Sequence, residues 1–134
     1  MSGLLDTSII VRYLTGQPPE LFAQAKDLIE REEGLQLTDA ALAEAAYVLT
    51  RVYRLPRDVV VDHLMALLQR RNMEPFRLDK GAVLQALLLC RPSGRVSFAD
   101  ALIWAAARSS QDKIVYTQDE RFPSDGIEIR RGRS

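Results

Sequence analysis

The chain has 134 residues, with 18 cationic and 18 anionic side chains, so its formal net charge is zero and no overall field draws it toward nucleic acid or a membrane surface. Hydrophobic residues make up 47% and charged residues 27%, a balance typical of soluble globular proteins. No apolar run approaches the roughly 20 residues of a membrane-spanning helix, and the N-terminus lacks the basic start and apolar segment of a secretory signal. We therefore expect one cytoplasmic domain over residues 1–134, with no membrane association.

The chain carries one cysteine and one histidine, which excludes several kinds of site. Cys90 has no partner for an internal disulfide, and neither a cysteine-rich zinc site nor a multi-histidine metal site can form. A serine or cysteine nucleophile would need His63 as its base, but His63 follows Val59 at helical spacing, which favours a structural or surface role. Cys90 ends the apolar run 87–90, and we expect a buried, inert thiol.

Arginine accounts for 15 of the 18 cationic residues, and its planar guanidinium suits phosphate and carboxylate groups. On composition alone, a codon or lineage bias toward arginine is the favoured explanation. The clearest basic cluster is the tail, residues 130–133, which can also be read as a solvated chain end.

Apolar periodicity and turn residues predict strands and helices that alternate along the chain. The expected strands are Leu4–Asp6, which leads into an apolar segment at 9–14, then Leu35–Thr38, Met73–Leu78, Lys113–Thr117 and Ile127–Ile129. The expected helices run from Pro18-Pro19 to a stop at Gly34, from about Asp39 to Tyr53, from Pro56 through Leu68, from a cap at Asp79 to Cys90, and from Ser97 to Ser110. Strands separated by helices indicate a parallel sheet covered on both faces, and so an α/β fold.

Two carboxylates lie inside apolar helices. Residues 40–49 contain nine apolar residues and one charge, Glu44, and residues 98–107 contain nine apolar residues and one charge, Asp100. A helix that is apolar all round is a buried helix, so each would carry its carboxylate into or beside the core.

Two further carboxylates come at the ends of predicted strands. Asp6 ends the first strand, and Asp119 comes just after the strand 113–117. In a parallel α/β sheet, ligands bind outside the carboxyl ends of the strands. Carboxylates that converge there repel one another and raise each other's pKa values, a conflict that a hard divalent cation such as Mg²⁺ or Mn²⁺ resolves.

Each acid also has a purely structural interpretation. Asp6 can cap a helix that begins near Thr7, and Asp100 has capping-box spacing from Ser97. Asp119 can belong to a turn. Glu44 lies too far inside its helix to be a cap, which leaves a buried salt bridge to an arginine as its alternative.

In combination, these positions resemble the PIN-domain nucleases, especially the VapC-type toxins of bacterial and archaeal toxin–antitoxin pairs. The matching pieces are Leu4-Leu5-Asp6-Thr7-Ser8, Glu44 in the third helix, Phe98-Ala99-Asp100-Ala101-Leu102-Ile103 and Tyr116-Thr117-Gln118-Asp119. Their order and spacing span nearly the whole chain. Each motif is weak alone, and the combination is specific.

The resemblance implies a three-layer α/β/α fold with a central parallel sheet of four or five strands, the first strand in the middle. It places the four acids together at the C-terminal edge of that sheet, with Mg²⁺ or Mn²⁺ as the cofactor. We expect Asp6 and Asp100 to be the central metal ligands, and Asp119 and Glu44 to complete the site directly or through water.

The resemblance also implies supporting residues, partners and an activity. Thr7 and Thr117 match hydroxyl positions that the family places beside the ligands, and with Ser8 they would orient those ligands. The implied activity is hydrolysis of RNA phosphodiester bonds by the toxin of a type II toxin–antitoxin module. The family commonly forms homodimers, and a cognate antitoxin reaches into the acidic pocket. Arginines near the rim, Arg12, Arg95 or Arg121, would hold the RNA backbone.

Two other functions compete with this one. A PIN-like scaffold that no longer cuts would bind a protein or RNA partner without taking up metal. A phosphotransferase of the haloacid dehalogenase type would use Asp6 as its nucleophile, but that pattern has a second aspartate two residues later, where this chain has Ser8.

Overall fold

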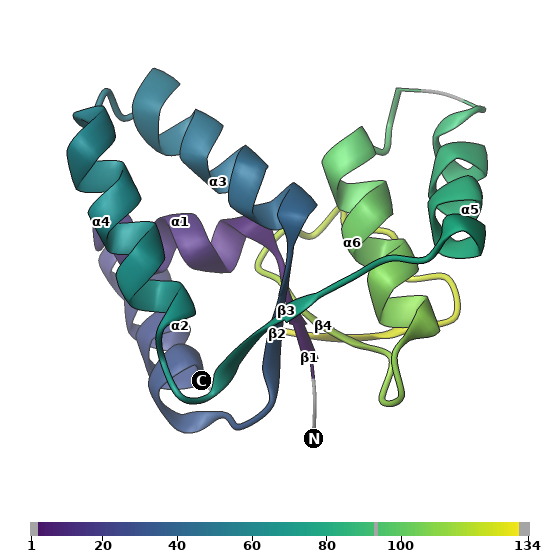
Figure 1. Ribbon diagram of the computed structural model, residues 1–134, viewed down its shortest axis with the longest axis horizontal. Helices are drawn as coiled ribbons and strands as arrows, with labels where there is room; N and C mark the ends of the chain where they lie inside the picture. The colour runs from purple at the N-terminus through teal and green to yellow at the C-terminus, as the bar shows by residue number, and fades with distance from the viewer. Residues whose placement is uncertain (1–2, 93, 132–134) are drawn as a thin grey trace.

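The structure, a computed structural model, describes residues 3–92 and 94–131. Within these ranges the chain forms five short strands and six helices (Figure 1). In chain order they are β1 Gly3–Leu5, α1 Thr7–Thr15, α2 Pro19–Arg31, β2 Leu35–Thr38, α3 Asp39–Arg51, α4 Arg57–Leu68, β3 Met73–Phe76, α5 Lys80–Cys90, α6 Phe98–Ser109, β4 Ile114–Tyr116 and β5 Glu128–Arg130.

All five strands pair in parallel, in the spatial order β3-β2-β1-β4-β5. The first strand is therefore central, as predicted. Figure 1 shows α1, α2, α3 and α4 on one side of the sheet and α5 and α6 on the other. This arrangement confirms the three-layer α/β/α fold.

The carboxyl ends of the strands lie at one edge of the sheet because the strands are parallel. Asp6 directly follows β1, Thr38 ends β2, and Thr117 directly follows β4. Helix α3 packs against both α1 and α6. The helices that carry Glu44 and Asp100 are therefore neighbours of each other and of this edge.

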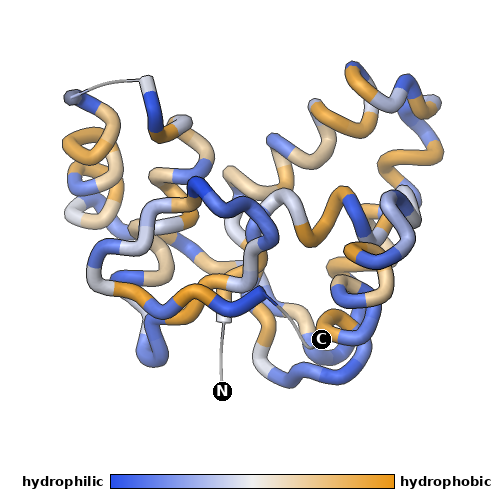
Figure 2. The backbone as a smooth tube through the Cα atoms, turned by 180° about the vertical axis from the view of Figure 1, so that it is seen from behind, coloured by the Kyte–Doolittle hydropathy of each residue, from blue (hydrophilic) through white to orange (hydrophobic). Residues whose placement is uncertain are grey.

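The core lies between the sheet and the inner faces of the helices. Its largest fully buried side chains are aliphatic, and they come from β1, β2, β4 and from α1, α2, α3, α4 and α6: Leu4, Leu5, Ile9, Ile10, Leu28, Ile29, Leu35, Leu37, Leu49, Leu67, Ile103 and Ile114. Hydrophobic and hydrophilic residues alternate along the outer helices (Figure 2), as expected for helices that bury one face only.

Polar side chains cap the N-termini of α3, α5 and α6. The side chains of Thr38, Asp79 and Ser97 accept hydrogen bonds from the backbone N–H groups of Ala41, Ala82 and Asp100, at 3.0, 2.8 and 3.0 Å. Capping satisfies backbone donors that the first helical turn leaves free. The caps at Asp79 and Ser97 confirm the predicted starts of α5 and α6.

Some predicted boundaries differ from the structure. The apolar segment 9–14 is part of helix α1, and β3 stops at Phe76 rather than Leu78. Pro75 lies in β3 without disrupting the sheet because β3 is an edge strand, where a missing N–H donor leaves no neighbour unpaired.

The prediction that Cys90 is buried is wrong. Its thiol is half-exposed and contacts the carbonyl oxygen of Ser97 at 3.8 Å. The reason is that α5 covers the outside of the molecule and buries only Ala82 and Ala86. His63 is exposed on α4, consistent with a surface role. In the part of the chain that the structure describes, no helix has the length and apolar character needed to cross a membrane.

Gly3 provides a test of how tightly the central strand packs. A Cβ atom at Gly3 would overlap the ring of Tyr116, which is buried on β4. We expect Gly3→Ala to lower the free energy of unfolding by about 1–3 kcal/mol, because the core has no room for the added methyl group. Urea denaturation measures this change.

The matched control is Gly81→Ala, near the start of α5, where an added Cβ has only ordinary van der Waals contact. This substitution should leave the free energy of unfolding unchanged or raise it, by at most about 1 kcal/mol. Equal effects of the two substitutions would contradict the packing described for β1 and β4.

Candidate metal centre

Asp6 is buried at the edge of the sheet, with 2% of its surface exposed. It occupies the N-cap position of α1, but its side chain makes no capping hydrogen bond. Its backbone N–H donates to the carbonyl oxygen of Tyr116 at 2.9 Å, and this hydrogen bond continues the pairing of β1 with β4. Helix capping therefore does not explain why an aspartate stands here.

Two hydroxyl groups hold one oxygen of the Asp6 carboxylate. Thr117 Oγ1 donates to Asp6 Oδ2 at 2.6 Å, and Ser8 Oγ donates to the same oxygen at 3.0 Å. Thr117 Oγ1 accepts in turn from the backbone N–H of Asp119 at 3.0 Å, and Ser8 Oγ from that of Gln118 at 3.0 Å. This network fixes the orientation of Asp6 and ties it to the loop that carries Asp119.

Among the residues that the structure describes, two buried oxygens at this edge have no hydrogen-bond partner: Asp6 Oδ1 and Thr7 Oγ1. Burying a carboxylate oxygen without a partner is costly. Both atoms are hard oxygen donors of the type that Mg²⁺ and Mn²⁺ prefer. The residues present therefore fit a divalent cation. Burial also raises the pKa of Asp6, although the hydrogen bonds from Thr117 and Ser8 act in the opposite direction, because the buried charge is poorly solvated.

Asp100 shows that the acids influence one another. It is half-buried at the third position of α6, where its backbone N–H donates to the capping Ser97. Its pKa is raised to about 7, first by burial and then by the negative charges of Asp6, Asp119 and Glu44. All four predicted acids therefore act on one part of the molecule.

Asp119 has the structural role that the sequence suggested, together with an electrostatic one. Its Oδ1 accepts from the backbone N–H of Arg121 at 2.9 Å, which stabilises a turn. Its negative charge also contributes to the raised pKa values of both Asp6 and Asp100. The side chain of Asp119 therefore both stabilises the turn and adds negative charge to the group of acids.

Glu44 differs from its prediction, because it is exposed rather than buried. Helix α3 buries Ala41, Ala45 and Leu49 and leaves Ala43 and Glu44 in solvent. Alanines raised the apolar count of this segment, although a small side chain can lie on an exposed face at little cost. Within residues 3–92 and 94–131 no ion pair involves Glu44, so the predicted salt-bridge alternative does not hold either.

The four acids share a region but not yet a single coordination sphere. Among the described residues, no three acidic, histidine or cysteine side chains lie close enough together to hold one ion. Repulsion between like charges favours such separation when nothing neutralises them. Simultaneous ligation by three of these carboxylates would require their side chains to move.

Arginines also lie beside this region. Arg131 Nη1 donates to the backbone carbonyl oxygens of Asp119 at 2.9 Å and Thr117 at 3.5 Å. Arg12 Nη1 donates to the side-chain oxygen of Gln118 at 3.0 Å, in the same loop. The sequence singled out Arg12 but not Arg131, whose only signal was its place in the basic tail. Arg121, also expected at the rim, is exposed.

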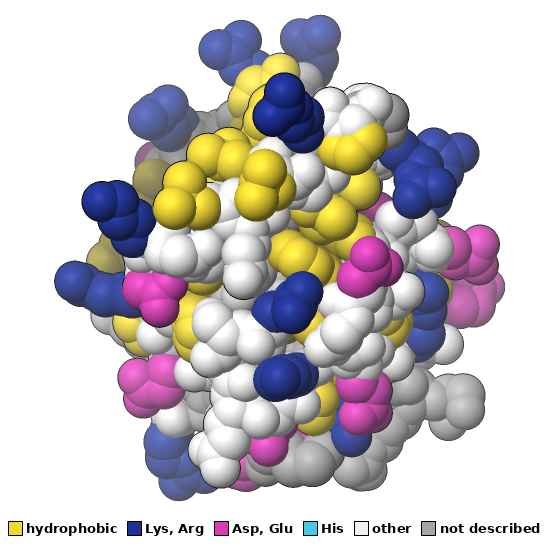
Figure 3. All heavy atoms as spheres, turned by 90° about the vertical axis from the view of Figure 1, so that its right-hand side faces the viewer, with side chains coloured by type: hydrophobic (Ala, Val, Ile, Leu, Met, Phe, Trp, Pro, Cys, Tyr) yellow, Lys and Arg dark blue, Asp and Glu magenta, His cyan; other side chains and the backbone are white. Residues whose placement is uncertain are grey.

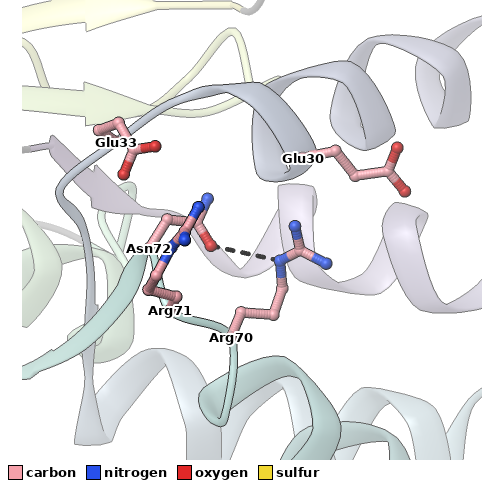
Figure 4. Close-up of a pocket in the computed structure, with 5 residues that line it drawn as sticks. All are labelled: Glu30, Glu33, Arg70, Arg71 and Asn72. Carbon is pink, nitrogen blue, oxygen red and sulfur yellow. Dashed lines mark hydrogen bonds between the residues drawn. The ribbon is translucent and has the colours of Figure 1, made fainter.

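A hollow lies at the opposite edge of the sheet, where β2 and β3 begin. Its lining mixes both signs of charge: Glu30, Glu33, Arg70, Arg71 and Asn72 (Figure 4). The Asn72 amide donates to the carbonyl oxygens of Ile29 and Glu32, both at 2.7 Å, and its Oδ1 accepts from Arg70 at 3.3 Å. Asn72 therefore joins the end of α2 to the start of β3, and the hollow is separate from the acidic edge.

The family model described as PIN domain matches residues 3–124. The fold is similar to that of Mycobacterium tuberculosis VapC20, a sarcin-ricin loop cleaving toxin, with a TM-score of 0.76 and 22% identity over 94% of this chain and 96% of that one. It is also similar to VapBC2 from Rickettsia felis bound to a promoter DNA fragment, with a TM-score of 0.68 and 16% identity over 97% and 98% of the chains. Comparison with the curated proteins gave no match.

The pKa of Asp100 predicts a pH-dependent stability. The pKa of Asp100 is about 7 in the folded protein and 3.8 in the unfolded chain. Between these pH values, the folded protein keeps a proton on Asp100 that the unfolded chain has already released. Stability without metal should therefore fall as the pH rises between these two values. We expect Asp100→Asn to raise the Tm in EDTA more at pH 8 than at pH 5, by about 2–4 °C for each kcal/mol recovered.

The control for this measurement is Asp58→Asn, which changes an exposed carboxylate in the first turn of α4. Its effect on the Tm should be small and similar at both pH values. A Tm shift for Asp100→Asn that does not grow with pH would contradict the charge repulsion assigned to this site.

Proposed function

Because the chain belongs to the PIN domain family, we propose that it is a metal-dependent endoribonuclease that acts as the toxin of a type II toxin–antitoxin pair. The observation that carries this proposal is the buried carboxylate of Asp6, whose Oδ1 has no hydrogen-bond partner among the described residues, at a sheet edge where the negative charges of other acids help burial to raise the pKa of Asp100. Such a cluster is destabilising in itself, and a bound cation is the simplest compensation.

In this proposal Asp6 and Asp100 hold Mg²⁺ or Mn²⁺, and Asp119 and Glu44 contribute directly or through water. A bound divalent cation lowers the pKa of water and neutralises charge on a phosphate. Thr117 and Ser8 keep Oδ2 of Asp6 in place, which leaves Oδ1 available as a ligand.

We further propose a protein partner, an antitoxin, and a homodimer as the assembled form. One of the similar structures is described as a VapBC2 complex on DNA, which supports a partner of this kind. This chain also exposes large apolar side chains that suit a protein contact. On α5 and at the start of α6 these are Leu84, Leu87, Leu88 and Phe98. Figure 3 shows hydrophobic side chains gathered mainly in the upper half of this face, with Lys and Arg side chains around, among and below them.

A non-catalytic PIN-like scaffold remains the second candidate. It is favoured by the separation of the acidic side chains, of which no three in the described chain can hold one ion without movement. Calorimetric titration with Mn²⁺ separates the two functions. A scaffold would take up no stoichiometric metal, whereas the nuclease would bind Mn²⁺ with Asp6 and Asp100 as ligands.

The nuclease proposal predicts loss of activity when the central acids lose their charge. In an assay on RNA with Mg²⁺ or Mn²⁺, Asp6→Asn and Asp100→Asn should each abolish cleavage while the circular dichroism spectrum remains that of the folded protein. Asp58→Asn should cleave like the wild type, because this exposed residue lies on α4. Cleavage that survives both substitutions, or survives exhaustive chelation, would rule out the metal mechanism.

Thr117 provides a finer test of the same site. It is fully buried and donates to Asp6 at 2.6 Å, so Thr117→Val removes the hydroxyl with little change in shape. We expect Mn²⁺ affinity, measured by calorimetry, to fall by about 10–100-fold, the usual effect of losing a residue that orients a metal ligand. Unchanged Mn²⁺ affinity would mean that this hydroxyl serves folding alone.

The partner proposal predicts which surface substitution weakens the complex. Leu88→Glu places a charge on a residue that is 64% exposed on α5, and it should lower antitoxin affinity at least about tenfold if this face is buried in the complex. Met65→Glu, 53% exposed on α4 across the sheet, is the control. Equal affinities of both variants and the wild type in a pull-down titration would exclude the α5 face.

A further inference from the structure

We propose that Arg131 binds a phosphate of the RNA substrate beside the acidic edge and so positions the strand for cleavage. This inference rests on the proposed nuclease function and adds a substrate-binding residue to it. It is carried by the hydrogen bonds of Arg131 to the loop that supplies Asp119.

The guanidinium of Arg131 is anchored by one of its nitrogens. Nη1 donates to the carbonyl oxygens of Asp119 and Thr117, and these are the hydrogen bonds that Arg131 makes within the described chain. A guanidinium has five N–H donors in a rigid, planar fork. Nε and the two hydrogens of Nη2 remain available, and the residue is exposed to solvent. The side chain is thus oriented while most of its donors are still free.

The position places this fixed positive charge next to the acids. Asp119 supplies both the carbonyl oxygen that Arg131 contacts and a carboxylate that raises the pKa values of Asp6 and Asp100. An RNA phosphate that approaches four carboxylates is repelled unless cations are close by. One bound metal ion offsets part of this repulsion, and an arginine at the rim would offset more while offering two parallel hydrogen bonds to phosphate oxygens.

Other arginines are less suited to this role. Arg12 also reaches the loop, but it is half-buried and donates to the side chain of Gln118. Gln118 in turn donates to the carbonyl oxygen of Leu21 at 3.0 Å, so this chain of contacts joins α1, α2 and the loop. Arg70 and Arg71 line the hollow at the opposite edge (Figure 4), together with two glutamates. Arg131 combines exposure, anchoring and proximity to Asp119.

The experiment compares Arg131→Gln with the wild-type chain. Binding of a fluorescein-labelled RNA oligonucleotide of about 20 unpaired nucleotides is measured by anisotropy in EDTA, which prevents cleavage, between 50 and 200 mM NaCl. We expect Arg131→Gln to raise the Kd about 5–10-fold and to lower the slope of log affinity against log salt by about 0.7, the value for one phosphate contact on a single strand. With Mn²⁺, KM should rise while kcat stays within about twofold.

Two further variants separate substrate binding from a structural role. Arg131→Lys keeps the charge and should restore the salt slope, with only part of the affinity, because it lacks the planar fork. Arg71→Gln changes an exposed arginine at the other edge and should leave Kd and slope unchanged. Thermal melts of all variants should agree to within about 2 °C.

The outcomes distinguish this inference from the function on which it rests. If the wild type cleaves RNA and Arg131→Gln keeps the wild-type Kd and salt slope, Arg131 is not a phosphate ligand, although the nuclease stands. If Arg131→Gln lowers kcat and Mn²⁺ affinity with the slope unchanged, the residue only braces the loop, and the inference is wrong. If the wild type cleaves no RNA with Mn²⁺, the proposed function and the inference both fall.

Discussion

The burial of the Asp6 carboxylate is the constraint on which the rest of the acidic edge depends. Asp6 is 2% exposed, its Oδ2 accepts hydrogen bonds from Thr117 and Ser8, and its Oδ1 has no hydrogen-bond partner within the described part of the chain. A carboxylate in such a place strongly favours whatever supplies positive charge, whether a proton or a cation. Asp119 and Asp100 add further carboxylates beside this position, and burial together with the negative charges of the other acids raises the pKa of Asp100 to about 7.

The fold delivers this arrangement through the order of its strands. With β1 in the centre and β4 beside it, the residues that follow these two strands meet at one edge, which brings Thr117 to Asp6 across 111 positions of sequence. The outer strand β5 then pairs with β4 and carries Arg131 to the same loop. A parallel sheet thus assembles acids, hydroxyls and a cation from segments that are far apart in the chain.

The sequence predicted the parts of this site that follow from strand ends and helix caps. Asp6 and Asp119 were found because strands end beside them, and α5 and α6 begin at their predicted caps. The exposure of Glu44 was missed because alanine counts as apolar in a pattern but packs on either side of a helix. Arg131 could not be placed because its position depends on the pairing of β5, a three-residue edge strand whose location is set by tertiary contacts.

Charge repulsion also links the stability of this protein to what it binds. Carboxylates whose pKa values are raised by burial and by one another weaken the folded state near neutral pH, because the unfolded chain solvates the same charges in water. A ligand that binds only the folded state adds stability in proportion to the logarithm of its concentration over its Kd. A cation, or a basic segment of a protein partner, would therefore stabilise the fold through the same acids. Since both would neutralise one cluster, the proposed cation and the proposed partner would compete for the same carboxylates.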